Sequence, residues 1–391
     1  MYDVIVVGAG PSGLMTATNL GRQGFKVLVL EKKAAVGNGV VCTGIIGEET
    51  FREFGLPESS ILKSINKMEV ISPQHNSSFY MHPQDFAFVV DRQKFDQDLE
   101  KMAKNQGAEI YLSSEALNAD VQRSSVEILL RKEEKYCERI AAKMLVIASG
   151  VNYKIQRRLK LGIPKNYLYG AQTEVDLDEL DHIQVFLGKD IAQGAFAWAV
   201  PLSNGRSKIG LMTERSPECC FQRFREKFLP AKFLTIDRNQ IQYKAIAQGL
   251  VSPTYGDRVM SVGEAAGQVK TTTGGGIYFG LLGAGFASQI IKESFEKGNF
   301  SSRIFSGYEK LWRKAIQNEI LIGYYSRKIW GKLSNTQIEK IFLLAKDDGV
   351  IPFLRKKGDF NWHSEFILTF MKRSPFGQFF KEKSERFVGT N

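Results

Sequence analysis

The sequence predicts an α/β protein with a discontinuous, doubly wound domain, an antiparallel sheet domain inserted into it, and a helical C-terminal region. First, residues 4–7 (VIVV) have the composition of a buried parallel strand, and a glycine-rich turn and a helix follow them. Second, the same succession of strand and glycine loop returns far along the chain, at residues 143–150 and 257–267. Third, short segments of alternating apolar and polar residues lie between these stretches, as in antiparallel strands.

The first 35 residues form a βαβ unit that meets each requirement of dinucleotide binding. Gly8, Gly10 and Gly13 complete the pattern G-x-G-x-x-G. They permit a tight turn, an approach of the backbone to a phosphate, and close packing of helix on strand. A second strand, KVLVL, ends at Glu31, where a carboxylate can accept hydrogen bonds from a ribose hydroxyl. The alternative is a purely structural glycine turn, but the complete series in the correct order favours a Rossmann-like nucleotide-binding domain.

The bulk composition is that of a folded globular protein. The chain has 391 residues, of which 43% are hydrophobic and 24% are charged. The N-terminus lacks a basic region before its short apolar run, and no stretch is long and apolar enough to span a bilayer, so we expect a cytoplasmic protein. The four cysteines show no C-x-x-C spacing, which argues against a metal or iron–sulfur site.

The positive charge is concentrated at the C-terminal end. Residues 300–391 contain 17 Lys/Arg and 9 Asp/Glu, so they carry +8 of the net charge of +11, and they also contain eleven phenylalanines. Segments such as FILTFMKRSPFGQFFKEK alternate aromatic and cationic groups. This pattern is typical of a peripheral membrane surface, and an ordinary solvated basic face of a helical domain explains it equally. Nucleic-acid binding is the weakest interpretation, because no recognised nucleic-acid-binding motif accompanies the charge.

The order of elements predicts three regions. Residues 36–47 read as a glycine-rich loop without regular structure, residues 91–110 as an amphipathic helix leading to a strand, and residues 257–294 as a strand, a glycine loop and a long apolar helix. We therefore expect a nucleotide-binding domain at 1–60, 91–165 and 245–298, a substrate-binding sheet domain at 61–90 and 166–244, and a helical region at 299–391.

Four segments together resemble the geranylgeranyl reductase family of FAD-dependent oxidoreductases, within the p-hydroxybenzoate-hydroxylase-like group. They are the opening glycine motif with Glu31, the segment VVDRQKFDQDL, the loop GEAAGQVKTTTGGGIYFG, and FAWAVP followed by KIGL. The resemblance covers roughly residues 1–295 and implies FAD as the cofactor. The residues that it places at FAD are Gly8, Gly10, Pro11, Ser12, Gly13, Glu31, Lys32, Thr43, Gly44, Arg92, Ala148, Gly150, Gly263, Glu264, Gly274, Gly275, Gly276 and Ile277.

The sequence departs from the pattern of the larger group at several positions. Glu264 replaces the usual aspartate and keeps its charge, while Thr271 stands where proline is common, which predicts a looser loop. Gly267 occupies a position where aromatic hydroxylases often carry histidine, and residues 148–150 (ASG) lack their aspartate-glycine pair. The last two departures favour reduction over oxygen chemistry.

The resemblance implies saturation of carbon–carbon double bonds in a polyprenyl chain or prenyl lipid. Such a hydrocarbon offers no hydrogen-bonding group, so it must be bound by burial of apolar surface. The residues expected to line its tunnel are Phe196, Trp198, Pro201, Gly210 and Phe279. Alternate aromatic residues on a strand are otherwise ordinary core packing. NADPH or a ferredoxin is the expected electron donor, and the oligomeric state is left open.

Cys42 is the candidate catalytic residue, because reductases of this kind place a cysteine near the flavin. The alternative is a small buried residue in a glycine loop, with the proton supplied by a water near Glu264 or Tyr278. Cys219 and Cys220 lie in a polar stretch that we expect to be exposed, and they receive no role.

Three other functions are compatible with the same motifs. One is a flavin-dependent monooxygenase or halogenase of an aromatic substrate, and another is a prenyl-binding carrier without redox chemistry. A quinone-linked electron-transfer dehydrogenase is also related, but the cysteines for its iron–sulfur cluster are absent from the sequence.

Overall fold

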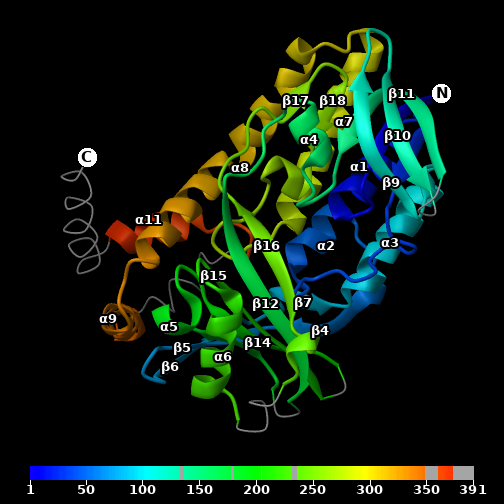
Figure 1. Cartoon of the computed structure of the whole chain (residues 1–391). Coiled ribbons are helices and arrows are strands. Elements are labelled where there is room, and N and C mark those ends of the chain that lie inside the picture. The colour runs from blue at the N-terminus through cyan, green and yellow to red at the C-terminus, as the bar shows by residue number, and fades with distance from the viewer. Residues whose placement is uncertain (133–135, 178–179, 204, 231–235, 348–359, 373–391) are drawn as a thin grey trace. The chain divides into compact units, whose positions relative to one another are not determined.

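The computed structural model describes residues 1–132, 136–177, 180–203, 205–230, 236–347 and 360–372. The chain divides into two compact units. Unit 1 comprises residues 1–62, 88–167 and 245–320, and unit 2 comprises residues 63–87, 168–244 and 321–391. The predicted mixed α/β architecture with C-terminal helices is confirmed (Figure 1).

Unit 1 is built on an eight-stranded sheet with a parallel centre. Val4 of β1 (Tyr2–Val7) pairs with the first residue of β2 (Val27–Leu30) and, on the other side, with Met144 of β11 (Tyr136–Ile147). Both neighbours run parallel to β1, and residues 4–7 are buried, as the apolar run VIVV requires. The rest of the order β17-β18-β11-β1-β2-β8 is formed by β17 (Tyr255–Gly256), β18 (Val259–Ser261) and β8 (Glu109–Tyr111).

A hairpin widens this sheet. The strands β9 (Ser114–Val121) and β10 (Val126–Lys132) are antiparallel, and β10 pairs in turn with β11 (Figure 1). Their apolar side chains join those of the central strands in the core of unit 1, where Ile128 and Leu130 are fully buried.

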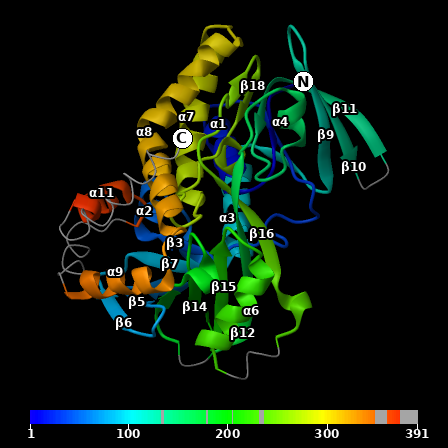
Figure 2. The same cartoon turned by 60° about the vertical axis from the view of Figure 1, so that its left-hand side comes forward.

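The helices predicted for unit 1 are present in the expected order, together with two short helices, at residues 48–54 and 154–158, for which the sequence gives no expectation. They are α1 (Pro11–Arg22), α2 (Glu48–Phe54), α3 (Arg92–Asn105), α4 (Lys154–Arg158), α7 (Ile277–Glu296) and the first part of α8 (Ser302–Trp330), with short 3-10 turns η1 (Glu58–Ser60) and η4 (Gly263–Ala266). Figure 2 shows α7 beside α8. A Cβ built on Gly307 of α8 would lie 3.2 Å from Cδ1 of Ile290 of α7, so glycine allows the two helices to pack closely there. The predicted loop at 36–47 is wrong for its last residues, since Ile45–Gly47 form β3, which pairs with β7 (Ala87–Val90). β7 also pairs with β4 (Ile61–Ile65).

Unit 2 contains most of a second sheet, of seven strands. Its order is β16 (Gln242–Gln248), β12 (Asn166–Asp176), β15 (Arg206–Thr213), β14 (Ala197–Pro201), β13 (Ile183–Phe186), β5 (Lys67–Ile71) and β6 (Ser77–Met81). The pairs that join β12, β15, β14 and β13 are antiparallel, as predicted, whereas β13 and β5, which come from two separate segments of unit 2, are parallel.

The described helices of unit 2 lie mainly in its C-terminal part. They are α5 (Lys189–Ala192), α6 (Pro217–Phe228), α9 (Asn335–Asp347) and α11 (Ser364–Lys372), with the 3-10 turn η3 (Arg238–Gln240) and the end of α8. Within the segment FILTFMKRSPFGQFFKEK, residues 373–383 lie outside the described residues. Among the described helices, none is long and apolar enough to cross a membrane.

Helix α6 corrects one expectation. Cys219 is exposed as predicted, but Cys220 is buried, with 1% of its surface exposed. Consecutive residues of a helix point in directions about 100° apart, so only one of the pair faces the sheet. Burial raises the pKa of the Cys220 thiol, which packs with Phe221 and Phe224 in the core of unit 2.

Candidate functional site

The turn between β1 and α1 is shaped by close backbone approaches. Gly8 has φ +107°, and a Cβ built on it would lie 2.4 Å from the carbonyl oxygen of Ala148. A Cβ on Gly13 would lie 2.0 Å from the carbonyl oxygen of Gly8. Both distances are far below a van der Waals contact, so these two positions require glycine. A Cβ on Gly10, by contrast, would meet no protein atom within 4 Å.

Gly10 caps the N-terminus of α1, and Pro11 occupies the first turn of the helix. The backbone N–H groups of a helix start favour an anion such as a pyrophosphate, and a glycine there lets the anion come close. The next residue, Ser12, packs instead against protein. Its hydroxyl oxygen would lie 2.3 Å from a Cβ on Gly263 and 2.2 Å from one on Gly280, which joins α1 closely to η4 and α7.

Glu31 is held in a fixed orientation at the end of β2. Its carboxylate accepts hydrogen bonds from the backbone N–H of Ala9 at 3.0 Å and of Lys33 at 2.9 Å. A carboxylate oxygen can accept further bonds, so the side chain remains able to take a ribose hydroxyl. Lys32, the neighbouring predicted residue, is exposed.

The glycine-rich loop lies along the start of α3. The N–H of Val90 donates to the carbonyl of Gly44 at 2.9 Å, and a Cβ on Gly44 would lie 3.4 Å from Cγ of Arg92. Thr43 and Cys42, which precede Gly44, are both half-buried. The loop thus holds its cysteine close to the arginine of the R-x-x-F-D segment.

Arg92 interacts with both Asp96 and Cys42. Its guanidinium donates to Asp96 at 2.8 and 3.1 Å, and both side chains are buried. Burial alone would lower the pKa of Arg92, but the Asp96 carboxylate and the Cys42 thiol outweigh it and raise the pKa. Among the described residues, the buried Nε of Arg92 has no hydrogen-bond partner. A permanent cation therefore lies at Cys42 with donor capacity left for a ligand.

A second cluster surrounds the end of β11. A Cβ on Gly150, which has φ +59°, would lie 3.8 Å from Oε2 of the half-buried Glu264. Tyr153 is buried nearby, and burial raises the pKa of its hydroxyl, with Tyr167 and Glu264 adding to the effect. The structure therefore brings the predicted residues of 148–150 and 263–264 together.

The loop that precedes α7 is closed by its own backbone. The N–H of Lys270 donates to the carbonyl of Gly275, and the N–H of Gly274 donates to the carbonyl of Lys270, both at 2.8 Å. Gly274, Gly276 and Ile277 are half-buried, and Gly275 is exposed. The Thr271 hydroxyl donates to the carbonyl of Ile320 at 2.7 Å and is buried, so the predicted loosening of this loop is wrong.

Helix α8 is hydrogen-bonded to the segment 261–268, which contains Glu264. The amide of Gln268 donates to the Tyr308 hydroxyl at 2.9 Å and accepts from the N–H of Gly263 at 2.7 Å. The Tyr308 hydroxyl then donates to the carbonyl of Ser261 at 2.7 Å. All four groups are buried, so this chain of bonds fixes the backbone on both sides of Glu264.

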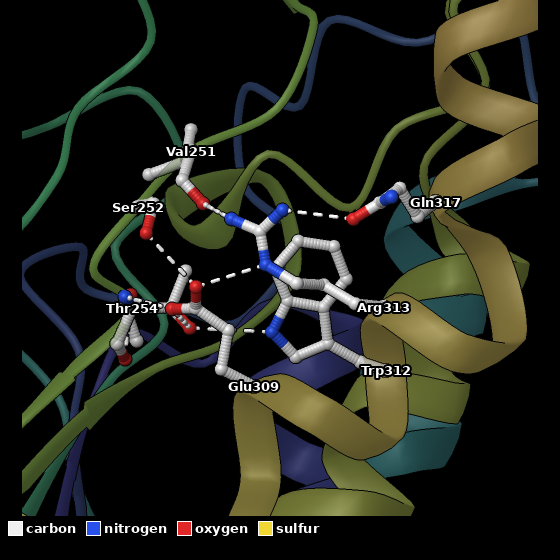
Figure 3. A network of polar contacts seen from close by, with 8 residues as sticks. Val251, Ser252, Thr254, Glu309, Trp312, Arg313 and Gln317 are labelled. Carbon is white, nitrogen blue, oxygen red and sulfur yellow. Dashed lines mark hydrogen bonds and ion pairs between the residues drawn. The ribbon is translucent and has the colours of Figure 1, made fainter. Parts of the chain in front are cut away.

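A second network on α8 centres on Glu309 (Figure 3). Its carboxylate accepts from the Ser252 hydroxyl at 2.8 Å, from the N–H and hydroxyl of Thr254 at 2.8 and 3.0 Å, and from Nε of Arg313 at 2.9 Å. Trp312 donates to the Thr254 hydroxyl as well. Burial alone would raise the pKa of Glu309, but these donors outweigh it and lower the pKa.

Sequence reasoning missed both networks. Gln268 and Tyr308 are 40 residues apart, and Glu309 lies 55 residues from Thr254, so no local spacing marks these pairs. The periodicity of residues 302–330 predicts a helix but does not reveal which of its polar side chains face the loop.

Two predicted substrate residues form a packed pair in unit 2. Phe196 and Trp198 have ring centroids 6.0 Å apart, and Trp198 lies opposite Gly210 on β15. A Cβ on Gly210 would lie 2.6 Å from the indole ring, so glycine makes room for Trp198. Within the described part of the chain, the buried Nε1 of Trp198 has no hydrogen-bond partner. Pro201 is also buried, at the end of β14.

Phe279, the fifth residue predicted for the substrate, belongs to unit 1. Its side chain has 0% of its surface exposed and packs near the Tyr278 ring. The Tyr278 hydroxyl donates to Glu53 of α2 at 2.8 Å. In this structure Phe279 is therefore part of the packed interior of unit 1.

The comparison with protein families identifies the nucleotide-binding fold. A family model described as an FAD binding domain matches residues 1–284. The chain belongs to this family. The residues present fit FAD: the space above Gly10 is free of protein atoms, the Glu31 carboxylate is pre-oriented, and Arg92 has a buried donor without a protein partner among the described residues.

Similar proteins support the resemblance seen in the sequence. The chain is 26% identical over 360 residues to digeranylgeranylglycerophospholipid reductase 1 of Methanococcoides burtonii, covering 88% of each chain. It is 28% identical over 359 residues to the digeranylgeranylglycerophospholipid reductase of Methanocaldococcus jannaschii, covering 87% of this chain and 90% of the relative. The predicted FAD-dependent oxidoreductase class and the resemblance to geranylgeranyl-lipid reductases are confirmed.

The fold has a solved counterpart of similar extent. A geranylgeranyl bacteriochlorophyll reductase-like protein from Thermoplasma acidophilum matches with a TM-score of 0.85 and 22% sequence identity, covering 98% of both chains. At this identity the similarity concerns the fold alone, and it includes the C-terminal helices as well as the FAD-binding part.

Proposed function

We propose that this protein is an FAD-dependent reductase that saturates carbon–carbon double bonds in the polyprenyl chains of a lipid. The observation that carries the proposal is the near full-length similarity to enzymes named digeranylgeranylglycerophospholipid reductase. FAD, when bound and reduced, supplies a hydride to one alkene carbon. Saturation is balanced only if a proton reaches the other carbon, so the protein has to supply an acid.

Cys42 is the proposed acid. Transfer of its S–H proton to carbon leaves a thiolate, and the permanently charged Arg92 beside it stabilises that anion. Solvent then returns the proton to sulfur. Asp96 keeps the guanidinium in place through its two hydrogen bonds. In this scheme Arg92 serves both the cofactor site and the proton donor.

The substrate is proposed to bind by burial of its isoprene units. Each CH₂ group removed from water contributes about 0.8 kcal/mol, so a chain of several units needs no polar contact. Phe196 and Trp198 would supply apolar aromatic surface, and the absence of a side chain at Gly210 fixes the position of the indole ring.

The domain assignments, the membrane contact and the electron donor are proposed as the sequence predicts them. FAD is assigned to residues 1–60, 91–165 and 245–298, the lipid to 61–90 and 166–244, and a helical region to 299–391. The basic, phenylalanine-rich end of the chain would contact a membrane surface that supplies the lipid. NADPH or a ferredoxin would supply the electrons.

Mass spectrometry of host lipids with and without the gene tests the proposed activity. We expect the strain without the gene to lose lipid species that are heavier by two mass units per saturated double bond. An unchanged lipid profile would count against the proposal. Oxygen uptake stimulated by an aromatic compound would instead favour a monooxygenase, and a purified protein that takes up no FAD would favour a carrier.

A Cys42→Ala variant tests the proton donor, with Cys137→Ala as the matched control because Cys137 is exposed. General acid catalysis contributes about 10²- to 10⁴-fold, so we expect a rate loss of that order for Cys42→Ala and none for the control. Both variants should retain FAD. Full activity of Cys42→Ala would transfer the role to a water near Glu264 or Tyr278.

A further inference from the structure

The part of unit 1 that follows β11 is strongly basic. Residues 150–167 contain five Lys/Arg and no Asp or Glu. Residues 1–299 carry only +3 in total, because residues 300–391 carry +8 of the net charge of +11, so this stretch is a local concentration of positive charge. Its cationic residues are all exposed, and we call them the α4 surface: Lys154, Arg157, Arg158, Lys160 and Lys165. A patch of one sign attracts partners of the opposite charge.

The protein itself neutralises little of this charge. Arg158 forms an ion pair with Asp120 at 3.1 Å, and the two side chains are 59% and 41% exposed. Within the described part of the chain, the other four cations of the α4 surface form no ion pair. Five cations and one carboxylate leave a net charge of +4, which is open to solvent.

The inner side of α4 is anchored in unit 1. Ile155 and Leu161 belong to the hydrophobic core of this unit. Gln156 is fully buried, and its amide donates to the carbonyl of Ala265 at 2.8 Å. Ala265 directly follows Glu264, so the base of the α4 surface is hydrogen-bonded to a segment that is assigned to FAD. The cations therefore belong to a fixed element beside the proposed cofactor site.

The α4 surface also lies at the ligand-binding edge of the sheet. The strands β1, β11 and β18 are parallel, and in open sheets of this kind ligands bind outside the carboxyl ends of the strands. The turns after these three strands contain Gly8, Gly150 and Gly263, all of them assigned to FAD. Helix α4 begins at Lys154, shortly after Gly150. A partner that docks on α4 therefore reaches the edge at which FAD is proposed to bind.

The distribution of the cations favours a protein as the partner. Sites for small molecules are concave and hold a few converging polar groups. Separate exposed cations instead produce a broad field, which speeds the encounter with an acidic protein and fixes its orientation. A membrane-binding helix combines cations with a row of large apolar side chains, but Ile155, the apolar residue of α4, is buried. The α4 surface therefore fits an acidic protein better than a nucleotide or a bilayer.

We propose that the α4 surface docks an acidic electron-carrier protein, of the ferredoxin class, that reduces FAD. The inference rests on the proposed reductase function and selects one of the two electron donors named there. Each carrier gives up one electron and leaves in its oxidised form. Two carriers in succession therefore reduce one FAD, which also takes up two protons from solvent. The first carrier has to leave before the second can dock, and a small interface held by exposed charges permits this exchange.

The test mixes the FAD-loaded full chain with a purified acidic [4Fe–4S] ferredoxin, reduced beforehand, in a stopped-flow instrument under argon. We expect the second-order rate constant of ferredoxin oxidation to fall as NaCl is raised from about 0.01 to 1 M, because salt screens the attraction. Lys154→Glu/Arg157→Glu should be at least about tenfold slower than wild type at low salt and approach it at high salt. The variant should retain FAD.

The matched control is Arg22→Glu/Lys292→Glu, which changes the net charge by the same amount. Both residues are exposed. Arg22 ends α1, which leads back from the turn at Gly8 to the opposite edge of the sheet, and Lys292 lies in the second half of α7. We expect this control to oxidise ferredoxin at the wild-type rate.

Equal rates for the two double variants would overturn the inference and leave the reductase proposal standing. A wild-type rate that does not depend on salt would overturn it as well, and this measurement needs no variant to fold. Two other results would assign the surface elsewhere. A raised KM for NADPH in Lys154→Glu/Arg157→Glu, with an unchanged ferredoxin rate, would indicate a nucleotide. Lost binding to phosphatidylglycerol vesicles, again with an unchanged ferredoxin rate, would indicate a membrane. A wild-type chain that oxidises ferredoxin but saturates no lipid would instead refute the proposed function and leave the docking surface standing.

Discussion

The Glu309 network offers a quantitative test of how α8 supports the FAD-binding unit. The carboxylate accepts four hydrogen bonds, two on each oxygen, and its side chain is only 12% exposed. In Glu309→Gln one oxygen becomes an NH₂ group, which faces two donors and cannot accept from them. A buried donor left unsatisfied costs about 1–3 kcal/mol. We therefore expect a loss of about 2–4 kcal/mol in the free energy of unfolding at pH 7.

The dependence on pH gives this prediction a second, independent part. The pKa of Glu309 is lower in the folded protein than its ordinary value, so its ionisation stabilises the folded state above that ordinary value, near pH 4.5. The stabilisation disappears as the pH falls through the folded pKa, because a protonated carboxyl group resembles the amide. The difference between wild type and Glu309→Gln should accordingly shrink between pH 7 and pH 3.5.

The assay is urea unfolding followed by tryptophan fluorescence, since Trp312 belongs to the network. For a unit of this size each kcal/mol corresponds to about 2–4 °C, so thermal melting should fall by roughly 4–16 °C. Glu296→Gln is the control, because that carboxylate is 63% exposed and should change stability by less than about 0.5 kcal/mol. Equal stabilities of the two variants at pH 7, or a deficit for Glu309→Gln that stays constant with pH, would refute the reasoning.

Three further substitutions test the FAD site and the aromatic pair. Gly10→Ala should leave the melting temperature of the FAD-free chain unchanged, because its Cβ meets no protein atom, yet weaken FAD binding at least tenfold. Gly285→Ala, equally open but inside α7, should leave FAD binding unchanged and raise the melting temperature slightly, because alanine is the better helix former. Glu31→Gln should raise the Kd for FAD about 10- to 100-fold in a fluorescence titration, and an unchanged Kd would contradict the ribose role. Gly210→Ala should displace the Trp198 indole and cost about 1–3 kcal/mol, and an unaltered near-UV circular dichroism spectrum would show that the ring did not move.

Much of the FAD-binding unit could be predicted because its signals are local. Gly8, Gly13 and Glu31 lie within one βαβ unit and are marked there by a turn, a helix–strand contact and a strand end. The approach of Gly8 to the carbonyl of Ala148 is the long-range part, which the local pattern does not show. The position of Cys42 beside Arg92 could be predicted only through the family resemblance, since the loop and α3 meet through tertiary pairing of Gly44 with Val90.

The errors have a common physical origin. The expectation of a looser loop, drawn from threonine in place of proline at position 271, misses the hydrogen bond that the Thr271 hydroxyl donates to the carbonyl of Ile320, 49 residues away. Cys220 lies among polar residues in the sequence, which suggests exposure. In α6 it nevertheless belongs to the buried face, together with Phe221 and Phe224. In both cases the local sequence gives the residue type but does not indicate the distant part of the chain against which that residue packs.

The central claim is that bound, reduced FAD passes its hydride to an alkene, and an anaerobic single turnover tests it most directly. The FAD-loaded protein would be reduced with dithionite under argon and mixed with a glycerophospholipid that carries unsaturated geranylgeranyl chains. The account predicts that the yellow oxidised flavin spectrum returns as the lipid gains two mass units per equivalent. A flavin that stays reduced with the lipid present, and is reoxidised only when oxygen is admitted, would contradict it.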